Sequence, residues 1–158
     1  MKNKNGTYTV KNESGTVTLY VDTLSQDIVD IDVAPGETCV KFETERINTR
    51  KRIGGTDTPT ISYCESLTEL DIPEQVEVIG INTFYCLKGL TTVNFHDGIK
   101  RIERYAFASC DKLNDITLPE SVTNIGQFAF GAAENIHLQG NFLPRGLVKA
   151  VAQNSTVI

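Results

Sequence analysis

The sequence is poor in several features that mark common functions. It has no tryptophan, one methionine and two histidines among 158 residues, and its four cysteines include no Cys-x-x-Cys pair. The missing cysteine pair argues against a zinc knuckle and against a thioredoxin-like site. The absence of tryptophan removes one of the residues most enriched at the energetic centres of protein interfaces.

Long apolar runs are also missing. No stretch approaches the ~20 apolar residues that a membrane-spanning helix needs. The first ten residues, MKNKNGTYTV, lack the apolar segment of a secretory signal peptide. From the residues alone we expect synthesis in the cytoplasm and no membrane partner, and we leave open a surface location reached by another route or after removal of a leader.

The charge balance is acidic, with a net charge of −5. Residues 61–158 contain 7 basic and 11 acidic side chains, and residues 1–60 contain 8 and 9. An acidic surface repels nucleic acids and anionic lipids, so we expect no nucleic-acid partner.

What the sequence does contain is a repeat. Residues 70–84, LDIPEQVEVIGINTF, and residues 116–130, ITLPESVTNIGQFAF, share six identical positions. A step of 23 residues aligns nearly all apolar residues of this region into columns, which is the signature of a stacked-repeat architecture. The columns are Leu67, Leu90, Leu113 and Ile136; Leu70, Val93 and Ile116; Ile72, Phe95 and Leu118; Val76, Ile99 and Val122; Ile79, Ile102 and Ile125; and Phe84, Phe107 and Phe130.

Each repeat predicts one turn of a coil. The pattern L-x-x-L-x-L indicates a short half-buried strand, which Pro73 and Pro119 end because proline cannot donate to a continuing ladder. The following V-x-x-I-G is a second extended piece, and its glycine (Gly80 or Gly126) permits a turn that a side chain would hinder. A phenylalanine then fills the centre, and a short helical or 3₁₀ turn leads to the next repeat. We predict a mainly-β, right-handed solenoid whose turns share one core.

The cysteines follow the same frame. Cys64 and Cys110 occupy equivalent positions three residues before Leu67 and Leu113, and Cys86 is displaced by one residue. Small buried core residues are the favoured interpretation. A disulfide between stacked turns is left open, and no metal or other cofactor is expected.

The repeat pattern L-t-x-L-x-I-P-x-x-V-x-x-I-G-x-x-A-F-x-x-C resembles the BspA-like leucine-rich repeat. The segments LNDITLPESVTNIGQFAF and IKRIERYAFASCDKL carry the resemblance, which covers about residues 64–138. It implies a curved solenoid used for binding, on bacterial surfaces or in phage-borne proteins. It implies no catalytic residues.

The flanking segments predict caps. TYTVKNESGTVTLYV reads as a β-hairpin, which can close the open sheet edge or pair with another subunit. The segment 27–37 is interpreted as a degenerate first L-x-x-L-x-L strand. Near the other end, Leu147, Val148 and Val151 predict one face of a short helix, and the final STVI predicts a strand. The expected organisation is a hairpin cap or assembly element at 1–26, a degenerate repeat at 27–63 with an inserted basic loop at about 42–60, three repeats at 64–140 and a C-terminal cap at 141–158.

Few residues suggest chemistry. The two histidines lie almost two repeats apart, and the sequence offers no acid–base pair, nucleophile motif or phosphate loop, so we expect no enzyme. Two candidate binding surfaces remain, neither of them distinguished from ordinary solvated polarity. The first is the outward strand face with Asp71, Asn94, Asp115 and His137, and the second is the basic loop with Arg46, Arg50, Lys51 and Arg52.

Two functions are compatible with these features. The first is a non-enzymatic interaction module that binds a protein or a glycan. The second is a structural component of a larger assembly, such as a decoration or tail protein of a phage virion, built through the N-terminal hairpin.

Overall fold

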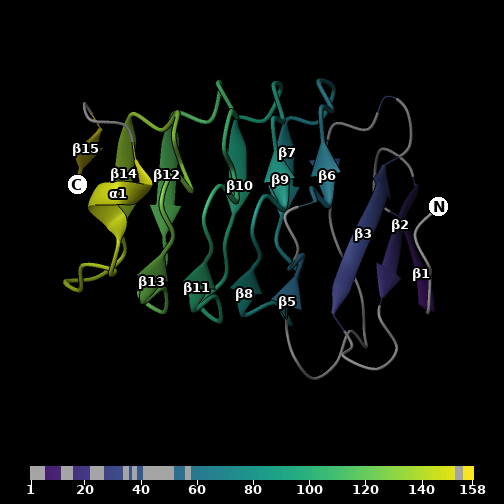
Figure 1. The fold of residues 1–158 in the computed structure, drawn as a ribbon, viewed down its shortest axis with the longest axis horizontal. Coiled ribbons are helices and arrows are strands. Elements are labelled where there is room, and N and C mark those ends of the chain that lie inside the picture. Colours follow the sequence, from purple (N-terminus) through teal and green to yellow (C-terminus); the bar gives the residue numbers. More distant parts are fainter. Residues whose placement is uncertain are drawn as a thin grey trace.

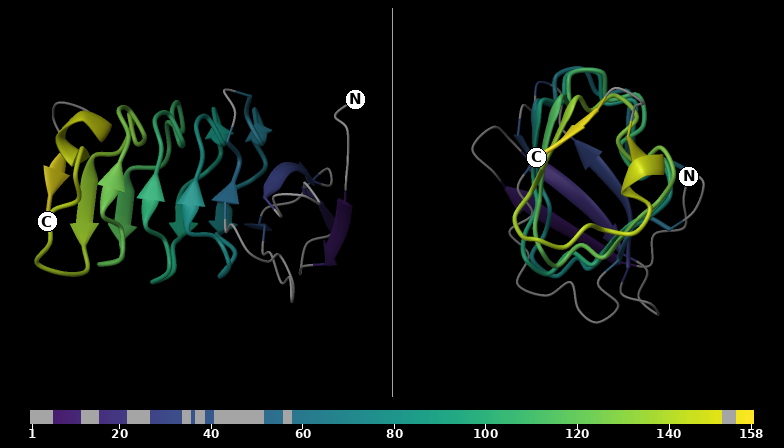
Figure 2. Two further views of the ribbon diagram at one scale, coloured as in Figure 1. Left: turned by 60° about the horizontal axis from the view of Figure 1, so that its bottom comes forward. Right: turned by 90° about the vertical axis from the view of Figure 1, so that its left-hand side faces the viewer.

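A computed structural model describes residues 6–11, 16–21, 27–33, 36, 39–40, 52–55, 58–151 and 155–158. The chain winds into a coil whose turns stack along the long axis of the molecule, with the two termini at opposite ends (Figure 1). Seen along that axis, the turns overlie one another in one closed outline (Figure 2). The predicted mainly-β solenoid is therefore confirmed.

The strands form ladders that run along the coil. The largest sheet has the order β1 (Gly6–Lys11), β2 (Thr16–Val21), β3 (Ile28–Val33), β5 (Arg52–Ile53), β8 (Val78–Ile79), β11 (Arg101–Ile102) and β13 (Asn124–Ile125). A second sheet contains β10 (Thr92–Asn94), β7 (Glu69–Asp71) and β4 (Cys39–Val40). The remaining sheets contain β12 (Asp115–Leu118), β14 (Asn135–Leu138) and β15 (Thr156–Val157), and then β6 (Ile61–Ser62) and β9 (Phe84–Tyr85).

Strand pairing follows the 23-residue step. Leu70 pairs with Val93 in parallel, and Ile102 pairs with both Ile79 and Ile125. Backbone hydrogen bonds continue the ladder beyond the strands, for example from Phe107 N–H to Ala129 C=O at 2.9 Å. Equivalent residues of successive turns therefore lie side by side, as the repeat frame requires.

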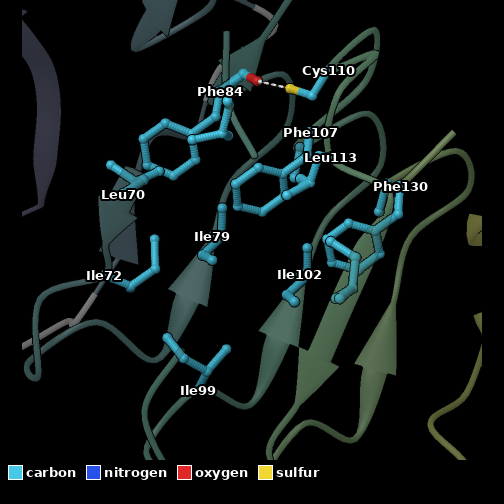
Figure 3. Packing of buried hydrophobic residues seen from close by; sticks show 14 of the residues in the cluster. Leu70, Ile72, Ile79, Phe84, Ile99, Ile102, Phe107, Cys110, Leu113 and Phe130 are labelled. Atoms are coloured by element: carbon cyan, nitrogen blue, oxygen red, sulfur yellow. Dashed lines mark hydrogen bonds between the residues drawn. The ribbon is translucent and has the colours of Figure 1, made fainter. Parts of the chain in front are cut away.

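A column of phenyl rings fills the centre of the coil (Figure 3). The ring centroids of Phe84 and Phe107 are 5.2 Å apart, those of Phe107 and Phe130 are 5.4 Å apart, and both pairs are stacked. Phe95 meets Phe107 and Phe130 edge-on at 5.9 and 6.2 Å. Such contacts add to the burial of large apolar area.

The other predicted core residues lie around this column. Leu70, Ile116 and Cys110 are buried, as predicted. Val93 and Cys64 are only partly buried and pack against the edge of the core.

Glycine in the I-G pair serves the contact between turns. A Cβ atom on Gly80 would lie 2.5 Å from the backbone nitrogen of Gly55, and one on Gly126 would lie 2.1 Å from that of Arg104. Neither glycine has a positive φ. The prediction that glycine permits a local chain reversal is therefore wrong. Glycine is needed here because a Cβ atom would clash with the backbone of the preceding turn of the coil.

Left-handed backbone recurs at two repeated positions of the turns. One position is occupied by Asn82, Tyr105 and Phe128, and the other by Tyr63, Cys86 and Ser109, with φ between 54° and 59°. The connections expected as helical or 3₁₀ are hydrogen-bonded and irregular turns, without a 3₁₀ helix in the described part of the chain.

The first turn differs from the prediction. β3 pairs in parallel with β5, in the ladder of the second strands, so the segment 27–37 is not the first L-x-x-L-x-L strand. That place belongs to β4, in which Val40 pairs with Leu70. The expected excursion at 42–60 is also wrong for its last part, because Arg52–Ile53 forms β5 and pairs with β8. Residues 41–51 lie outside the described residues.

The predicted N-terminal hairpin is present. β1 and β2 pair antiparallel over their full length, and β2 joins the solenoid through antiparallel pairing with β3. The Tyr20 hydroxyl donates a hydrogen bond to the Asp32 carboxylate across β2 and β3.

The C-terminal cap agrees with the prediction in part. The helix α1 (Leu147–Ala150) has only four residues and buries Leu147 and Ala150, whereas Val148 is 83% exposed and does not share their face. The final strand is confirmed, since β15 pairs in parallel with β14. Within the described ranges, this helix falls far short of the length and apolarity needed to cross a membrane.

Replacement of the central ring tests the phenyl column. Phe107→Ala should lower the free energy of unfolding by about 3–5 kcal/mol, because it leaves a cavity between two stacked rings. Urea denaturation measures the change, and Phe142→Ala, which removes an exposed ring, is the control that should stay near wild type. A loss below about 1 kcal/mol at Phe107 would show that the ring is not buried there.

Candidate binding surface

The outward strand face places its predicted residues in two small clusters. Asn94 on β10 donates through its amide to Glu69 at 2.8 Å and to Asp71, both on β7. On the next pair of strands, Asn135 donates to Asp115 at 3.0 Å, and His137 Nε2 lies 3.4 Å from the same carboxylate oxygen. The structure thus brings Asp71 to Asn94 and Asp115 to His137. These groups hydrogen-bond to one another between turns, and their role in binding stays a prediction.

The two histidines do not share a site. His96 Nδ1 accepts a hydrogen bond from the backbone N–H of Gly98 at 3.0 Å, so this ring is tied to its own turn. Across the described ranges, no three side chains among His, Cys, Asp and Glu are grouped so as to hold a metal ion.

Of the basic loop, only Arg52 lies within the described residues; Arg46, Arg50 and Lys51 lie outside them. Arg52 forms a two-pronged ion pair with Glu103, with Nη1 3.1 Å from Oε1 and Nη2 bound to Oε2. Its Nε donates to Gly54 C=O at 3.1 Å. Because β8 lies between β5 and β11, this ion pair spans two steps of the ladder. The structure gives Arg52 a role in holding turns together.

The neighbouring basic residues are also paired with acids. Lys100 Nζ lies 3.0 Å from Glu77, one repeat earlier, and Arg101 Nε lies 3.7 Å from Glu103. This part of the wall therefore presents little net positive charge.

Three of the four cysteines have side chains that the structure describes. Cys64, Cys86 and Cys110 are free thiols, so the disulfide left open by the sequence does not join any two of them. Cys110 donates its S–H to Phe84 C=O at 3.3 Å, and burial raises the pKa of this thiol to about 12. A thiol with this pKa is protonated at neutral pH and is a poor nucleophile.

A group of exposed aromatic side chains, which the sequence did not single out, lies on the wall that contains β6 and β9. We call it the aromatic ridge and define it as Tyr63, Tyr85, Tyr105 and Phe128. Tyr63, Tyr105 and Phe128 are 67%, 37% and 44% exposed. Tyr105 stacks on Phe128 with centroids 5.6 Å apart, and Tyr63 meets Tyr85 edge-on at 6.0 Å.

The ridge rests on strained backbone. Tyr63, Tyr105 and Phe128 each have a φ of 56°. Left-handed conformation costs a residue with a Cβ roughly 1–2 kcal/mol and is rare for bulky side chains. Asparagine tolerates it best after glycine, and Asn82 occupies the same position one turn before Tyr105. Large rings are an uncommon choice for this conformation.

A shallow groove of about 530 Å³ runs beside the ridge. Its lining is Pro59, Ser62, Tyr63, Asn82, Tyr85 and Tyr105. These described residues combine aromatic and aliphatic carbon with hydroxyl and amide groups, and none of them carries a charge. Clefts of this composition are typical of ligand sites.

A signal for the ridge was present in the sequence. Tyr105 and Phe128 lie 23 residues apart, outside all the core columns, and Tyr63 and Tyr85 lie 22 apart. The repeated apolar columns of the sequence contain core positions only. The left-handed backbone that turns these rings outward is not visible in the residue types.

Comparison with known proteins agrees with the repeat frame. The sequence model described as "BspA type Leucine rich repeat region" matches residues 57–146, in six copies. A leucine-rich repeat protein from Bacteroides capillosus has a similar structure, with a TM-score of 0.59, 22% identity, and coverage of 84% of this chain and 99% of that one. A leucine-rich repeat protein from T. pallidum gives a TM-score of 0.55 and 19% identity, and 88% of this chain and 77% of that one are covered. At these identities the two structures show the fold alone. No curated protein matches the sequence.

The Arg52–Glu103 ion pair can be tested by comparison with an exposed pair. Arg52→Met should lower the free energy of unfolding by about 1–3 kcal/mol, because it leaves the 20%-exposed Glu103 carboxylate without its charge-assisted hydrogen bonds. The matched control is Lys88→Met, which removes a cation from the exposed pair with Asp111 and should leave unfolding close to wild type. Chemical denaturation at low and moderate salt measures both, and equal effects of the two variants would contradict the structural role of Arg52.

Proposed function

Because the chain belongs to the BspA-type leucine-rich repeat family, we propose that it is a non-enzymatic interaction module that binds its ligand through the aromatic ridge. The family is a repeat family, whose repeated positions supply the core. A ligand would therefore contact the surface side chains, which vary between turns. The ridge is the most distinctive group of such side chains among the described residues.

The observation that carries the proposal is the combination of exposure and backbone strain at Tyr63, Tyr105 and Phe128. Tyrosine is enriched at interface hot spots, and its ring supplies a large contact area with few rotatable bonds. The ridge also stands on a wall of parallel backbone hydrogen bonds, which holds the rings in fixed places. Preorganised rings lower the entropy cost of binding.

The proposal is tested by removing a ring without disturbing the fold. Tyr105→Asn introduces the residue found at the equivalent Asn82, so the variant should keep its unfolding free energy within about 1 kcal/mol of wild type, since relief of backbone strain offsets the lost ring contact. Wild type and variant are screened against a displayed random-peptide library and an immobilised glycan array.

We expect at least one class of probe to bind wild type, and the affinity to fall at least about tenfold in Tyr105→Asn, the effect of losing one contact worth about 1.4 kcal/mol. The control Phe142→Asn changes an exposed ring outside the ridge and should bind as wild type does. Absence of any binder, or binding that both variants retain, would contradict the proposal.

A second candidate is a structural role in a larger assembly, such as a phage virion. It is supported by β1 at the edge of the seven-stranded sheet and by exposed apolar side chains that gather near the C-terminal end. Those side chains are Phe142, Leu143, Val148, Val157 and Ile158. Edge strands and apolar patches of this kind are places where chains associate.

The assembly role predicts self-association. The mass measured by light scattering after size-exclusion chromatography should rise above 17.4 kDa as concentration increases, and Val148→Lys with Ile158→Lys should reduce it. A constant monomer mass at all concentrations would contradict this candidate.

A further inference from the structure

We propose that the groove beside the aromatic ridge binds an uncharged glycan, with one sugar ring seated over Asn82. This inference rests on the proposed function and specifies the ligand class of the same site.

The position of the groove follows from the repeat. The pairing of Ile61 with Phe84 makes Pro59 equivalent to Asn82, and the 23-residue step makes Asn82 equivalent to Tyr105 and Phe128. Four successive turns therefore present Pro59, Asn82, Tyr105 and Phe128 in one column. Tyr105 and Phe128 carry aromatic rings, whereas Pro59 and Asn82 have small side chains.

The groove is the place that a ring at residue 82 would occupy. Tyr105 stacks on Phe128 with centroids 5.6 Å apart, so one face of Tyr105 is covered from the C-terminal side. Tyr105 also lines the groove together with Asn82 and Pro59. Pro59 and Tyr105 stand two turns apart, which is roughly 10 Å at the usual spacing of neighbouring strands. A single six-membered ring fits this spacing and continues the stack.

The chemical groups of the lining residues favour a sugar as the ring that binds there. The apolar C–H face of a sugar packs on an aromatic ring, and its edge carries hydroxyls that both donate and accept hydrogen bonds. Ser62, Asn82 and the tyrosine hydroxyls also do both. None of the described lining residues is charged, so these residues offer an acidic sugar no counter-charge for the hydration that it would lose.

A proline-rich peptide is the competing occupant, because such peptides bind aromatic-lined grooves. The carbonyl groups of such a peptide only accept hydrogen bonds, so they need donors in the groove. The indole N–H of tryptophan, which is a donor only, is absent from this chain. The mixed donors and acceptors of the groove therefore favour a polyhydroxylated ligand.

The decisive variant fills the groove instead of emptying it. Asn82→Tyr should be accommodated, because Tyr105 takes the same backbone conformation at the equivalent position. The new ring would complete the stack and exclude a sugar. The full chain and this variant are applied to an immobilised array of neutral, sialylated and sulfated glycans and to a displayed peptide library.

We expect wild type to retain neutral glycans in preference to acidic ones, and Asn82→Tyr to lose at least about 90% of that signal while unfolding at the same denaturant concentration as wild type or a higher one. The control Phe142→Tyr should bind as wild type does. A neutral glycan from the array, titrated free in solution, should change the tyrosine fluorescence of wild type, because three of its five tyrosines line the groove.

Other outcomes separate the two proposals. Binding of peptides alone, lost in Tyr105→Asn, would overturn the glycan inference and leave the interaction module standing, as would a preference for sialylated or sulfated glycans. Neutral-glycan binding that survives Asn82→Tyr would overturn the assignment to this groove. No binding on either array would overturn both proposals.

Discussion

The structure depends on the contact between one turn and the next. A single turn has too little apolar surface to bury, and the backbone groups of its strands pair with those of the neighbouring turns. The stacked rings of Phe84, Phe107 and Phe130 and the parallel hydrogen bonds around them meet both needs at once. The 23-residue step keeps the stacked rings and the parallel hydrogen bonds in register. Glycine at residues 80 and 126 follows from the same contact, because the preceding turn leaves no space for a Cβ atom.

The contact between turns fixes the residues of the core and leaves the outward-facing residues free to vary. Left-handed backbone recurs at two positions of the turns, yet the repeat does not specify the side chain there, as Asn82, Tyr105 and Phe128 show. These side chains point away from the core, so they can change without loss of the coil. Tyrosine and phenylalanine are costly choices for such a backbone. Their presence on a rigid, partly exposed wall is the feature that best supports a binding role.

Most of the fold could be predicted from the sequence because the core repeats. Phe107 and Ile102 were assigned correctly since each residue has partners 23 positions away on both sides. The first turn could not be assigned in this way. Ile28 lies 25 residues before Ile53, and Ile53 lies 26 before Ile79, so unequal loops hide the register that the strands reveal. The binding surface was harder still, because the exposure of Tyr105 depends on its φ, and the ion pair of Arg52 joins residues 51 positions apart.

The central claim is that equivalent phenylalanines of successive turns touch inside the coil. Nuclear Overhauser spectroscopy on protein with labelled phenylalanine rings tests it most directly. We predict cross-peaks between the ring protons of Phe84 and Phe107 and between those of Phe107 and Phe130, with none between Phe84 and Phe130. A spectrum without the first two contacts, or with a direct contact between Phe84 and Phe130, would contradict the stacked coil.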